Sequence, residues 1–208
     1  MNQTKDSARR WFDRRARSYE SGATSRWRDP VQRASLAALD LIAGDRLLDV
    51  GCGTGAASRA AAATAEAVVG ADLSFQMIRQ ADDLATGIER VRFLVADSEQ
   101  LPFADRAFSA VLCSNSFHHY PDPLRALREM ARVLAPSGRI VIGDACSDLA
   151  TARIADFFLR RFEPGHVRLY RASELGEFLQ RAGMSHVMLR TLSGGGFAVV
   201  RGIASRAA

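Results

Sequence analysis

The stretch from residue 47 to residue 55, Leu-Leu-Asp-Val-Gly-Cys-Gly-Thr-Gly, constrains the fold of this chain most. Its apolar beginning predicts a short buried strand, and Asp49 stands just before the loop that follows. Glycine has no Cβ and tolerates a positive φ, so Gly51, Gly53 and Gly55 let the chain turn tightly and bring its backbone against a ligand. The stretch therefore predicts a strand that turns through a glycine loop into a helix, beside a nucleotide-type cofactor.

The composition predicts one soluble domain over residues 1–208, because 48% of the residues are hydrophobic and no long apolar run occurs. We expect a helical cap over 1–44, a cofactor-binding core over 45–145 and an acceptor side over 146–208. Neither a secretory signal nor a transmembrane segment is predicted, and the cytoplasm is the expected location. The isolated residues Cys52, Cys113 and Cys146 predict neither a disulfide framework nor a metal site.

Positive charge is concentrated near the beginning of the chain. Residues 1–28 hold eight basic residues against three acidic ones, an excess that equals the whole net charge of +5. No aromatic or glycine-rich RNA-binding signature accompanies this segment. We therefore expect a solvated basic helix face, and nucleic acid is not an expected partner.

Strand and helix patterns alternate along the chain. This alternation predicts an α/β fold: a Rossmann-like doubly wound sheet of seven strands, mostly parallel, with an antiparallel C-terminal hairpin and a helical N-terminal cap. The first expected strand ends near residue 50, and the other six cover 67–71, 91–96, 108–113, 139–143, 187–192 and 197–203. The expected helices cover 8–22, 31–42, 56–65, 149–162 and 173–182, and two more begin after the caps Ser74 and Asp122. Gly22 is expected to end the first of them, and Asp29-Pro30 to start the second.

Polar residues stand at the ends of five predicted strands. Ligands of a doubly wound sheet bind outside the carboxyl ends of its strands, so we expect these side chains to converge at one edge. They are Asp49, Asp72, Asp97, Ser114 and Asp144.

The glycine loop is compatible with two classes of cofactor. Gly51, Gly53 and Ala56 satisfy the dinucleotide fingerprint, and Asp72 follows at the distance at which a carboxylate holds a ribose hydroxyl. Asp49, however, places a carboxylate where it would repel a pyrophosphate and attract a cationic sulfonium or amino group. The pattern therefore favours S-adenosylmethionine over NAD.

Further motifs accompany the glycine loop in a fixed order along nearly the whole chain. They are Phe12-Asp13-x-x-Ala16-x-x-Tyr19, residues 47–55, Asp72-Leu73-Ser74-x-x-Met77, Ala96-Asp97 with Leu101-Pro102-Phe103, His118-His119, and Glu129-x-x-Arg132-Val133-Leu134-x-Pro136-x-Gly138. This set resembles the class I S-adenosylmethionine-dependent methyltransferases, especially the small-molecule branch that includes the ubiquinone and menaquinone biosynthesis enzymes. The family's Pro-Gly-Gly reads Pro136-Ser137-Gly138 here, a departure in a turn away from the expected cofactor site.

The resemblance implies how the cofactor is held. Asp49 would hold its methionine end, directly or through water, and the backbone at Gly51 and Gly53 would approach the sulfonium. Asp72 would accept hydrogen bonds from both ribose hydroxyls, since an ionised carboxylate has two accepting oxygens. Adenine would pack on Leu73 and Met77, and Asp97 would accept from its amine. The remaining expected cofactor residues are Cys52, Gly55, Ser98 and Ser114.

Methyl transfer needs little catalytic machinery, since the cofactor supplies an activated electrophile. A phenol, hydroxyl or activated carbon acceptor benefits from a general base, for which His119 is the first candidate and His118 the second. Both can equally be structural. Candidate residues for the acceptor pocket, or for packing, are Trp11, Tyr19, His166 and Tyr170.

The expected reaction is methyl transfer from S-adenosylmethionine to a small apolar or aromatic metabolite, with S-adenosylhomocysteine as the product and the acceptor atom left open. Three alternatives stand beside it: a non-catalytic cofactor-binding regulator or subunit, an RNA methyltransferase that uses the basic N-terminal segment, and an NAD-dependent oxidoreductase. The oligomeric state is open, with a homodimer as one candidate.

Overall fold

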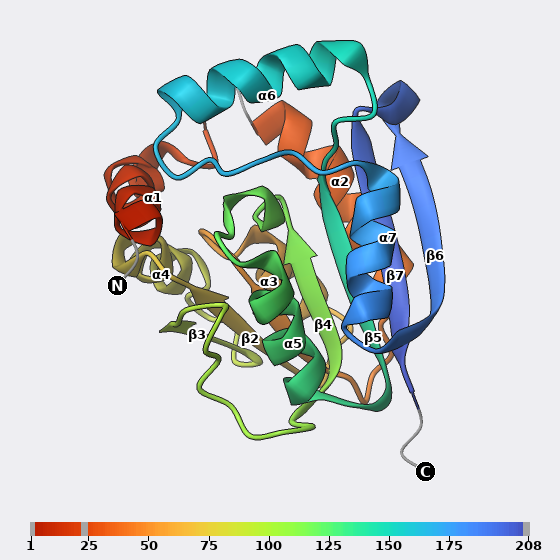
Figure 1. The fold of residues 1–208 in the computed structure, drawn as a ribbon. Helices are drawn as coiled ribbons and strands as arrows, with labels where there is room; N and C mark the ends of the chain where they lie inside the picture. Colours follow the sequence, from red (N-terminus) through yellow and green to blue (C-terminus); the bar gives the residue numbers. More distant parts are fainter. Residues whose placement is uncertain (1–2, 22–24, 206–208) are drawn as a thin grey trace.

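The computed structural model describes residues 3–21 and 25–205 and shows a seven-stranded sheet with helices on both faces (Figure 1). The strands follow the order β3-β2-β1-β4-β5-β7-β6. The first five pair in parallel, whereas β7 lies between β5 and β6 and is antiparallel to both. The predicted fold class is therefore confirmed. The strands are β1 (Arg46–Val50), β2 (Ala67–Asp72), β3 (Val91–Val95), β4 (Phe108–Ser114), β5 (Leu134–Ala145), β6 (Met184–Leu192) and β7 (Phe197–Ala204).

Helices connect the strands and also precede the first of them. In Figure 1, α1 packs beside α4, and α6 crosses the end of the sheet toward which the β4 arrow points. Within the described part of the chain, no helix is both long and apolar enough to cross a membrane. The helices are α1 (Gln3–Arg15), α2 (Ser25–Leu39), α3 (Ala56–Ala61), α4 (Phe75–Leu84), α5 (Pro123–Val133), α6 (Ala150–Phe162) and α7 (Ala172–Arg181), with short 3-10 turns η1 (Ala16–Ser18), η2 (Phe117–His119) and η3 (Ser193–Gly195).

The central strands bury side chains on both faces of the sheet, which explains their nearly continuous apolar sequences. Successive side chains of a strand point to opposite faces. Leu48 accordingly belongs to a core that α5 and α7 complete, whereas Leu47 belongs to a second core that includes residues of α2 and α3. The glycine loop begins where both cores end, so its first residues are anchored by a buried strand.

Two helix starts follow the predicted capping chemistry. The Ser74 hydroxyl accepts a hydrogen bond from the Met77 N–H at 3.1 Å ahead of α4, and the Asp122 carboxylate accepts one from the Arg125 N–H at 3.0 Å ahead of α5. Each cap satisfies an N–H of the first turn that has no partner within the helix. The caps hold the segments that follow β2 and η2 at the carboxyl edge of the sheet.

Several predicted boundaries are wrong. α2 begins at Ser25, so Asp29 is not its cap and Pro30 lies inside the helix; residues 25–28 contain no helix breaker, and the helix forgoes one backbone hydrogen bond at the proline. α3 ends at Ala61, before the expected residue 65, because the chain turns toward β2. β5 already begins at Leu134, and its pairing with β4 shifts register through an irregular segment before Arg139. The helix expected to run to Gly22 is also wrong at its end, since α1 stops at Arg15 and the 3-10 turn η1 follows; Gly22 itself lies outside the described residues.

Candidate functional site

A cavity of about 670 Å³ lies at the carboxyl ends of the first strands and is partly open to solvent. Its lining joins segments that are far apart in the sequence: α1, the glycine loop and the loops after β2, β3 and β4. The lining residues are Lys5, Ala8, Arg9, Phe12, Tyr19, Gly51, Gly53, Asp72, Leu73, Ser74, Met77, Asp97, Ser98, Asn115, Ser116, His119, Tyr120 and Pro121.

The glycine loop presents its backbone to this cavity. Gly51 and Gly53 have φ values of +72° and +54°, and a Cβ on Gly51 would lie 2.4 Å from the Ser116 hydroxyl oxygen. No side chain fits at that position without displacing its neighbours. Gly55 does not line the cavity; a Cβ there would lie 2.5 Å from the Phe93 ring. The first two glycines therefore expose backbone to a ligand, and the third lets the loop pack on the sheet.

Asp72 ends β2 beside the glycine loop, and both of its oxygens bind backbone N–H groups. One oxygen accepts from Gly53 at 2.9 Å and the other from Ser74 at 2.8 Å. Burial raises the pKa of Asp72 above its ordinary value, while these N–H groups oppose the rise. A carboxylate oxygen can accept more than one hydrogen bond. Asp72 can therefore hold the loop and accept from ligand hydroxyls at the same time.

A second cavity, of about 710 Å³, adjoins the first at the glycine loop. Tyr19, Gly51, Gly53 and Asn115 line both cavities. An elongated ligand can therefore lie across the two glycines with one end in each cavity. The other residues of the second cavity, which include the expected Cys52 and Ser114, are Glu20, Asp29, Gln32, Cys52, Thr54, Ala56 and Ser114.

Asp49 lies behind the glycine loop and lines neither cavity. Its carboxylate is 1% exposed and accepts a hydrogen bond from the Ser58 hydroxyl at 2.6 Å. Burial raises the pKa of Asp49 to about 6; the hydrogen bond from Ser58 opposes the rise and the charge of Asp72 adds to it. The structure thus places the Asp49 carboxylate beneath the loop, out of contact with both cavities.

The loop after β2, the first turn of α4 and the loop after β3 add apolar and polar surface to the first cavity. Leu73 and Met77 line it, and Met77 is only 1% exposed. Asp97 and Ser98 line it as well, and both oxygens of Asp97 accept from the Lys5 ammonium, at 2.9 and 2.7 Å. Sequence reasoning missed Lys5, because nothing local in α1 indicates a partner after β3.

The N-terminal segment is tied over the cavities by polar contacts to three loops. In addition to the Lys5 pair, Asp13 accepts a hydrogen bond from the Ser74 hydroxyl at 2.6 Å, and Glu20 accepts one from the Thr54 hydroxyl at 2.7 Å. These partners belong to the loops after β2 and β1. α1 and η1 therefore cover a ligand bound at the glycine loop.

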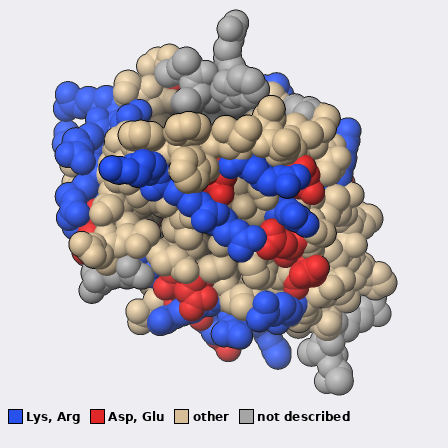
Figure 2. All heavy atoms as spheres, turned by 45° about the horizontal axis from the view of Figure 1, so that its top comes forward, with Lys and Arg blue, Asp and Glu red and all other residues tan. Residues whose placement is uncertain are grey.

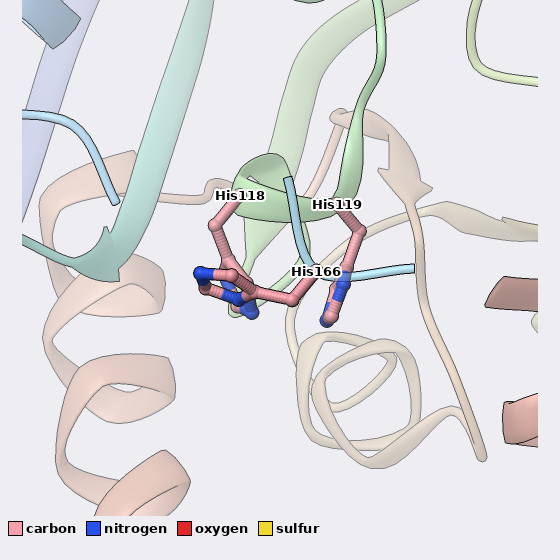
Figure 3. A group of neighbouring side chains, drawn as sticks. All are labelled: His118, His119 and His166. Carbon is pink, nitrogen blue, oxygen red and sulfur yellow. The ribbon is translucent and has the colours of Figure 1, made fainter. Parts of the chain in front are cut away.

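Three histidines meet beside the first cavity (Figure 3). His118 and His119 belong to η2, and His166 lies in the loop after α6; one ring nitrogen of each lies within 4.8 Å of the others. His119 lines the cavity, whereas His118 does not. The His166 side chain is 0% exposed. The two predicted bases thus lie together, but only His119 lines the cavity.

Hydrogen bonds fix the orientation of the η2 histidines. His118 Nδ1 lies 2.7 Å from Asp144, whose carboxylate raises the pKa of His118 above its ordinary value although burial works against it. His119 Nδ1 lies 3.1 Å from the Gly165 carbonyl oxygen. Burial and the neighbouring His118 lower the pKa of His119 well below its ordinary value. A carbonyl only accepts, so neutral His119 donates from Nδ1 and keeps Nε2 as an acceptor.

The other candidates for the acceptor pocket divide into lining and packing residues. Tyr19 lines both cavities. Trp11 and Tyr170 line neither: Trp11 lies under the Arg15 guanidinium at 3.8 Å, and Tyr170 packs against Phe117 with ring centroids 5.6 Å apart. Of the two predicted roles, pocket lining or packing, Trp11 and Tyr170 therefore have the packing role.

Sequence reasoning missed four lining residues between β4 and α5: Asn115, Ser116, Tyr120 and Pro121. Asn115 adopts a positive φ of +55°, a conformation that asparagine tolerates better than most residues. The Tyr120 hydroxyl lies 3.1 Å from the Ser116 hydroxyl and 3.3 Å from the Val50 carbonyl oxygen. This network holds the loop against the glycine loop. The sequence did offer one signal for these residues: a polar run stands directly after β4, and the carboxyl end of that strand lies at the site.

The basic N-terminal segment is divided between interior and surface. Lys5 is buried in its ion pairs, whereas Arg10 and Arg14 are exposed. Figure 2 shows Lys and Arg side chains gathered at the left edge of the view, the side on which Figure 1 places α1, and acidic side chains among the basic ones elsewhere. The basic segment thus contributes both a buried cation and exposed arginines.

Comparison with known proteins gives a consistent result. A family model described as a methyltransferase domain matches residues 48–142. A demethylmenaquinone methyltransferase of Clavibacter sepedonicus is 32% identical over 212 residues, which cover 92% of this chain and 85% of that protein. A 27-O-demethylrifamycin SV methyltransferase of Amycolatopsis mediterranei is 44% identical over 110 residues, which cover 51% of this chain but only 40% of that protein.

Solved structures share the fold at low sequence identity. The YcgJ protein of Bacillus subtilis superposes with a TM-score of 0.75 at 21% identity, over 86% of this chain and 100% of that one. A Haloferax volcanii methyltransferase, solved in complex with an activator, gives a TM-score of 0.82 at 22% identity, over 94% of this chain and 98% of that one. At these identities the likeness describes the arrangement of the sheet and helices.

Proposed function

Because the chain belongs to the class I S-adenosylmethionine-dependent methyltransferases, we propose that it transfers a methyl group from S-adenosylmethionine to a small-molecule acceptor and releases S-adenosylhomocysteine. The observation that carries this proposal is the pair of cavities that meet at Gly51 and Gly53, with Asp72 beside them. S-adenosylmethionine has an adenosine at one end and an amino acid at the other. The exposed loop backbone and the two cavities fit that elongated shape.

The first cavity suits the adenosine. In this proposal the ribose hydroxyls donate to Asp72, and the adenine ring packs on Leu73 and Met77, with Ser98 at its edge. Asp97 accepts from the adenine amine. Lys5 contacts both Asp97 and Glu99 and offsets part of their charge, and an Asp97 oxygen can accept a further hydrogen bond from the neutral amine.

The second cavity suits the amino-acid end of the cofactor. Cys52 and Ser114 line it, and the backbone of Gly51 and Gly53 separates it from the first cavity. Asp49 attracts the cationic sulfonium and ammonium through the loop, without touching them. Gly55 serves the packing of the loop.

The bound cofactor supplies a methyl group on a sulfonium, so the chain has to align the acceptor and exclude water. α1 and η1 cover the cavities through Lys5, Asp13 and Glu20. His119 is the first candidate for taking a proton from the acceptor, because its ring lines the cavity and its Nε2 is not used by Gly165. His118, held by Asp144 outside the cavity, is the second.

We propose a small apolar or aromatic acceptor, and the acceptor atom stays open. Phe12, Tyr19 and Tyr120 give the first cavity an aromatic lining. The names of two relatives, a demethylmenaquinone methyltransferase and a demethylrifamycin methyltransferase, also indicate ring-containing acceptors. We further propose that residues 1–208 act as one domain in the cytoplasm; a homodimer stays a prediction that light scattering tests.

Thermal unfolding with saturating S-adenosylhomocysteine and, separately, NAD tests the cofactor. A ligand at about 100 times its Kd stabilises the folded state by about 2.7 kcal/mol, which shifts the Tm by several degrees in a protein of this size. We expect the shift with S-adenosylhomocysteine alone, and we expect Asp72→Ala to lose it. The exposed Asp83→Ala on α4 is the matched control. A shift with NAD alone would overturn the proposal in favour of an oxidoreductase.

Two further measurements separate the remaining alternatives. Release of S-adenosylhomocysteine with a panel of quinol and phenol acceptors distinguishes an enzyme from a non-catalytic cofactor-binding subunit, which would show the Tm shift and no turnover. RNA binding across salt concentrations tests the basic segment, since binding to phosphates weakens steeply as salt rises. We expect no salt-sensitive RNA binding.

A further inference from the structure

The three histidines of Figure 3 form a cluster that methyl transfer by itself does not require. The ring centroids of His118 and His119 lie 4.0 Å apart, and those of His118 and His166 lie 5.4 Å apart. One nitrogen of each ring lies within 4.8 Å of the other two. Burying several imidazoles together is unfavourable unless their polar atoms find partners. The partners of each ring nitrogen therefore decide whether this cluster is satisfied without a ligand.

Carboxylates stand behind two of the rings. His118 Nδ1 lies 2.7 Å from Asp144, and His166 Nε2 lies 2.8 Å from Asp156. Both carboxylates are fixed in turn: Asp144 accepts from the His118 backbone N–H at 2.9 Å, and Asp156 accepts from Arg160 at 2.6 Å. A histidine that binds a metal characteristically holds its other nitrogen on such a carboxylate, which orients the ring and makes it a better ligand.

The third ring is held by a backbone carbonyl, the other usual partner of a metal-binding histidine. His119 Nδ1 lies 3.1 Å from the Gly165 carbonyl oxygen. Each of the three rings thus uses one nitrogen for an outer partner and retains the other.

The retained nitrogen of His166 is the decisive atom. Its Nδ1 is buried and has no hydrogen-bond partner within the described part of the chain, and the side chain is 0% exposed. Because Nε2 faces the Asp156 carboxylate and donates to it, Nδ1 carries a lone pair. A buried lone pair without a donor is destabilising by about 1–3 kcal/mol. A cation between the rings would satisfy it.

We propose that His118, His119 and His166 bind a divalent transition-metal ion, with Zn²⁺ as the first choice. Three imidazoles with an open fourth position are a ligand set of catalytic zinc, whereas Mg²⁺ and Ca²⁺ prefer oxygen ligands. A zinc to nitrogen distance of about 2.1 Å in a tetrahedron places the nitrogens about 3.4 Å apart, so the rings close by about an ångström on binding. Because His119 lines the first cavity, we expect the open position to face that cavity.

The role that we infer for this ion depends on the proposed methyl transfer. An acceptor hydroxyl on the open position loses its proton to water more readily, because the ion lowers its pKa. The oxygen then forms the bond to the methyl carbon, the carbon–sulfur bond breaks, and its electron pair stays on the sulfur of S-adenosylhomocysteine. In the loaded enzyme His119 is a ligand and not the base.

Titration of the purified protein with Co²⁺ tests the site itself. We expect one equivalent to bind with the visible absorption of a tetrahedral nitrogen site and without thiolate charge-transfer bands, and we expect Zn²⁺ to displace it. His119→Gln and His166→Gln should each raise the Kd at least tenfold. His186→Gln, which changes the exposed fourth histidine on β6, is the matched control and should bind like the wild type.

A milder variant and a separate readout keep the test decisive. Asp144→Asn leaves all three rings and should raise the Kd about tenfold to a hundredfold through His118. No saturable binding, equal binding by the histidine variants, or thiolate bands from the cysteines would each overturn the metal site. The Tm shift with S-adenosylhomocysteine is measured on the same samples, so failure of the metal site and failure of the proposed function are distinguishable.

Discussion

Replacing Asp49 by asparagine tests whether the protein keeps a buried charge for its ligand at the expense of its own stability. Asp49 is 1% exposed and accepts a hydrogen bond from the Ser58 hydroxyl, and burial raises its pKa to about 6. Asparagine keeps the size and one accepting oxygen but carries no charge. We expect Asp49→Asn to unfold less readily than the wild type and to bind S-adenosylmethionine more weakly.

The expected gain in stability follows from the pKa of Asp49. It rises from 3.8 to about 6, and each tenfold change in proton affinity is worth about 1.36 kcal/mol. A raised pKa stabilises the folded state below pH 3.8, and this contribution is lost as the pH rises through 6. The ionised carboxylate therefore lowers the free energy of unfolding by about 3 kcal/mol above pH 7. Asparagine carries no charge and avoids that loss, but the altered hydrogen bond with Ser58 costs about 1 kcal/mol. The expected net gain in the free energy of unfolding is therefore about 2 kcal/mol.

Urea unfolding of the wild type and of Asp49→Asn at about pH 5 and about pH 8 measures this difference. We expect the variant to be more stable by about 2 kcal/mol at the higher pH and by clearly less at the lower one. Asp83→Asn on the exposed face of α4 is the control. A variant less stable than the wild type at about pH 8, or a difference independent of pH, would refute the reasoning.

The same variant distinguishes an electrostatic role of Asp49 from a role in the conformation of the glycine loop. S-adenosylmethionine carries a sulfonium charge that S-adenosylhomocysteine lacks. Loss of the Asp49 charge should weaken binding of the former roughly tenfold and of the latter by less, as measured by calorimetry. Equal losses would mean that Asp49 acts on the conformation of the loop.

Three further substitutions test other contacts. Gly51→Ala introduces a clash and backbone strain and should lower the free energy of unfolding by about 2–4 kcal/mol, whereas Gly87→Ala, with φ +86° and open space around it, should lower it by about 1 kcal/mol in urea unfolding. Lys5→Met breaks the ion pairs that hold α1 over the cavity, so S-adenosylhomocysteine should dissociate faster in stopped-flow measurements; an unchanged rate would contradict that role for α1. Arg132→Lys loses the two-pronged contact with Glu129 and should destabilise by about 1–2 kcal/mol, with calorimetry showing unchanged affinity for S-adenosylhomocysteine.

Sequence reasoning succeeded where neighbouring residues determine the structure. The apolar run before Gly51 forms β1 because its side chains fill cores on both faces of the sheet. Ser74 and Asp122 start helices because their side-chain oxygens reach N–H groups three residues ahead. Each of these outcomes depends on contacts within a few residues, and a single sequence displays them.

It failed where distant segments meet. Lys5 and Asp97 are separated by 92 residues, and their pairing depends on how α1 docks, which no local pattern encodes. The start of α2 was placed too late for a related reason: Pro30 is a common first residue of a helix, but the preceding residues continue the helix here. His166 joins the η2 histidines only through the path of the loop after α6, so no ligand spacing could be read from the chain.

The docking of α1 also decides the electrostatics of the site, which composition alone could not. Without Lys5, carboxylates would be unopposed beside the cavity at Asp72 and Asp97 and beneath the glycine loop at Asp49. The Lys5 ammonium contacts Asp97 at 2.7 Å and Glu99 at 2.6 Å, so it offsets part of the negative charge after β3, whereas Asp49 and Asp72 accept from neutral hydroxyl and N–H donors. A cation is therefore favoured at Gly51 and Gly53 and a neutral ring beside Asp97, whereas a pyrophosphate at the loop would face two buried carboxylates. This asymmetry is the physical reason to expect S-adenosylmethionine to bind and NAD to be rejected.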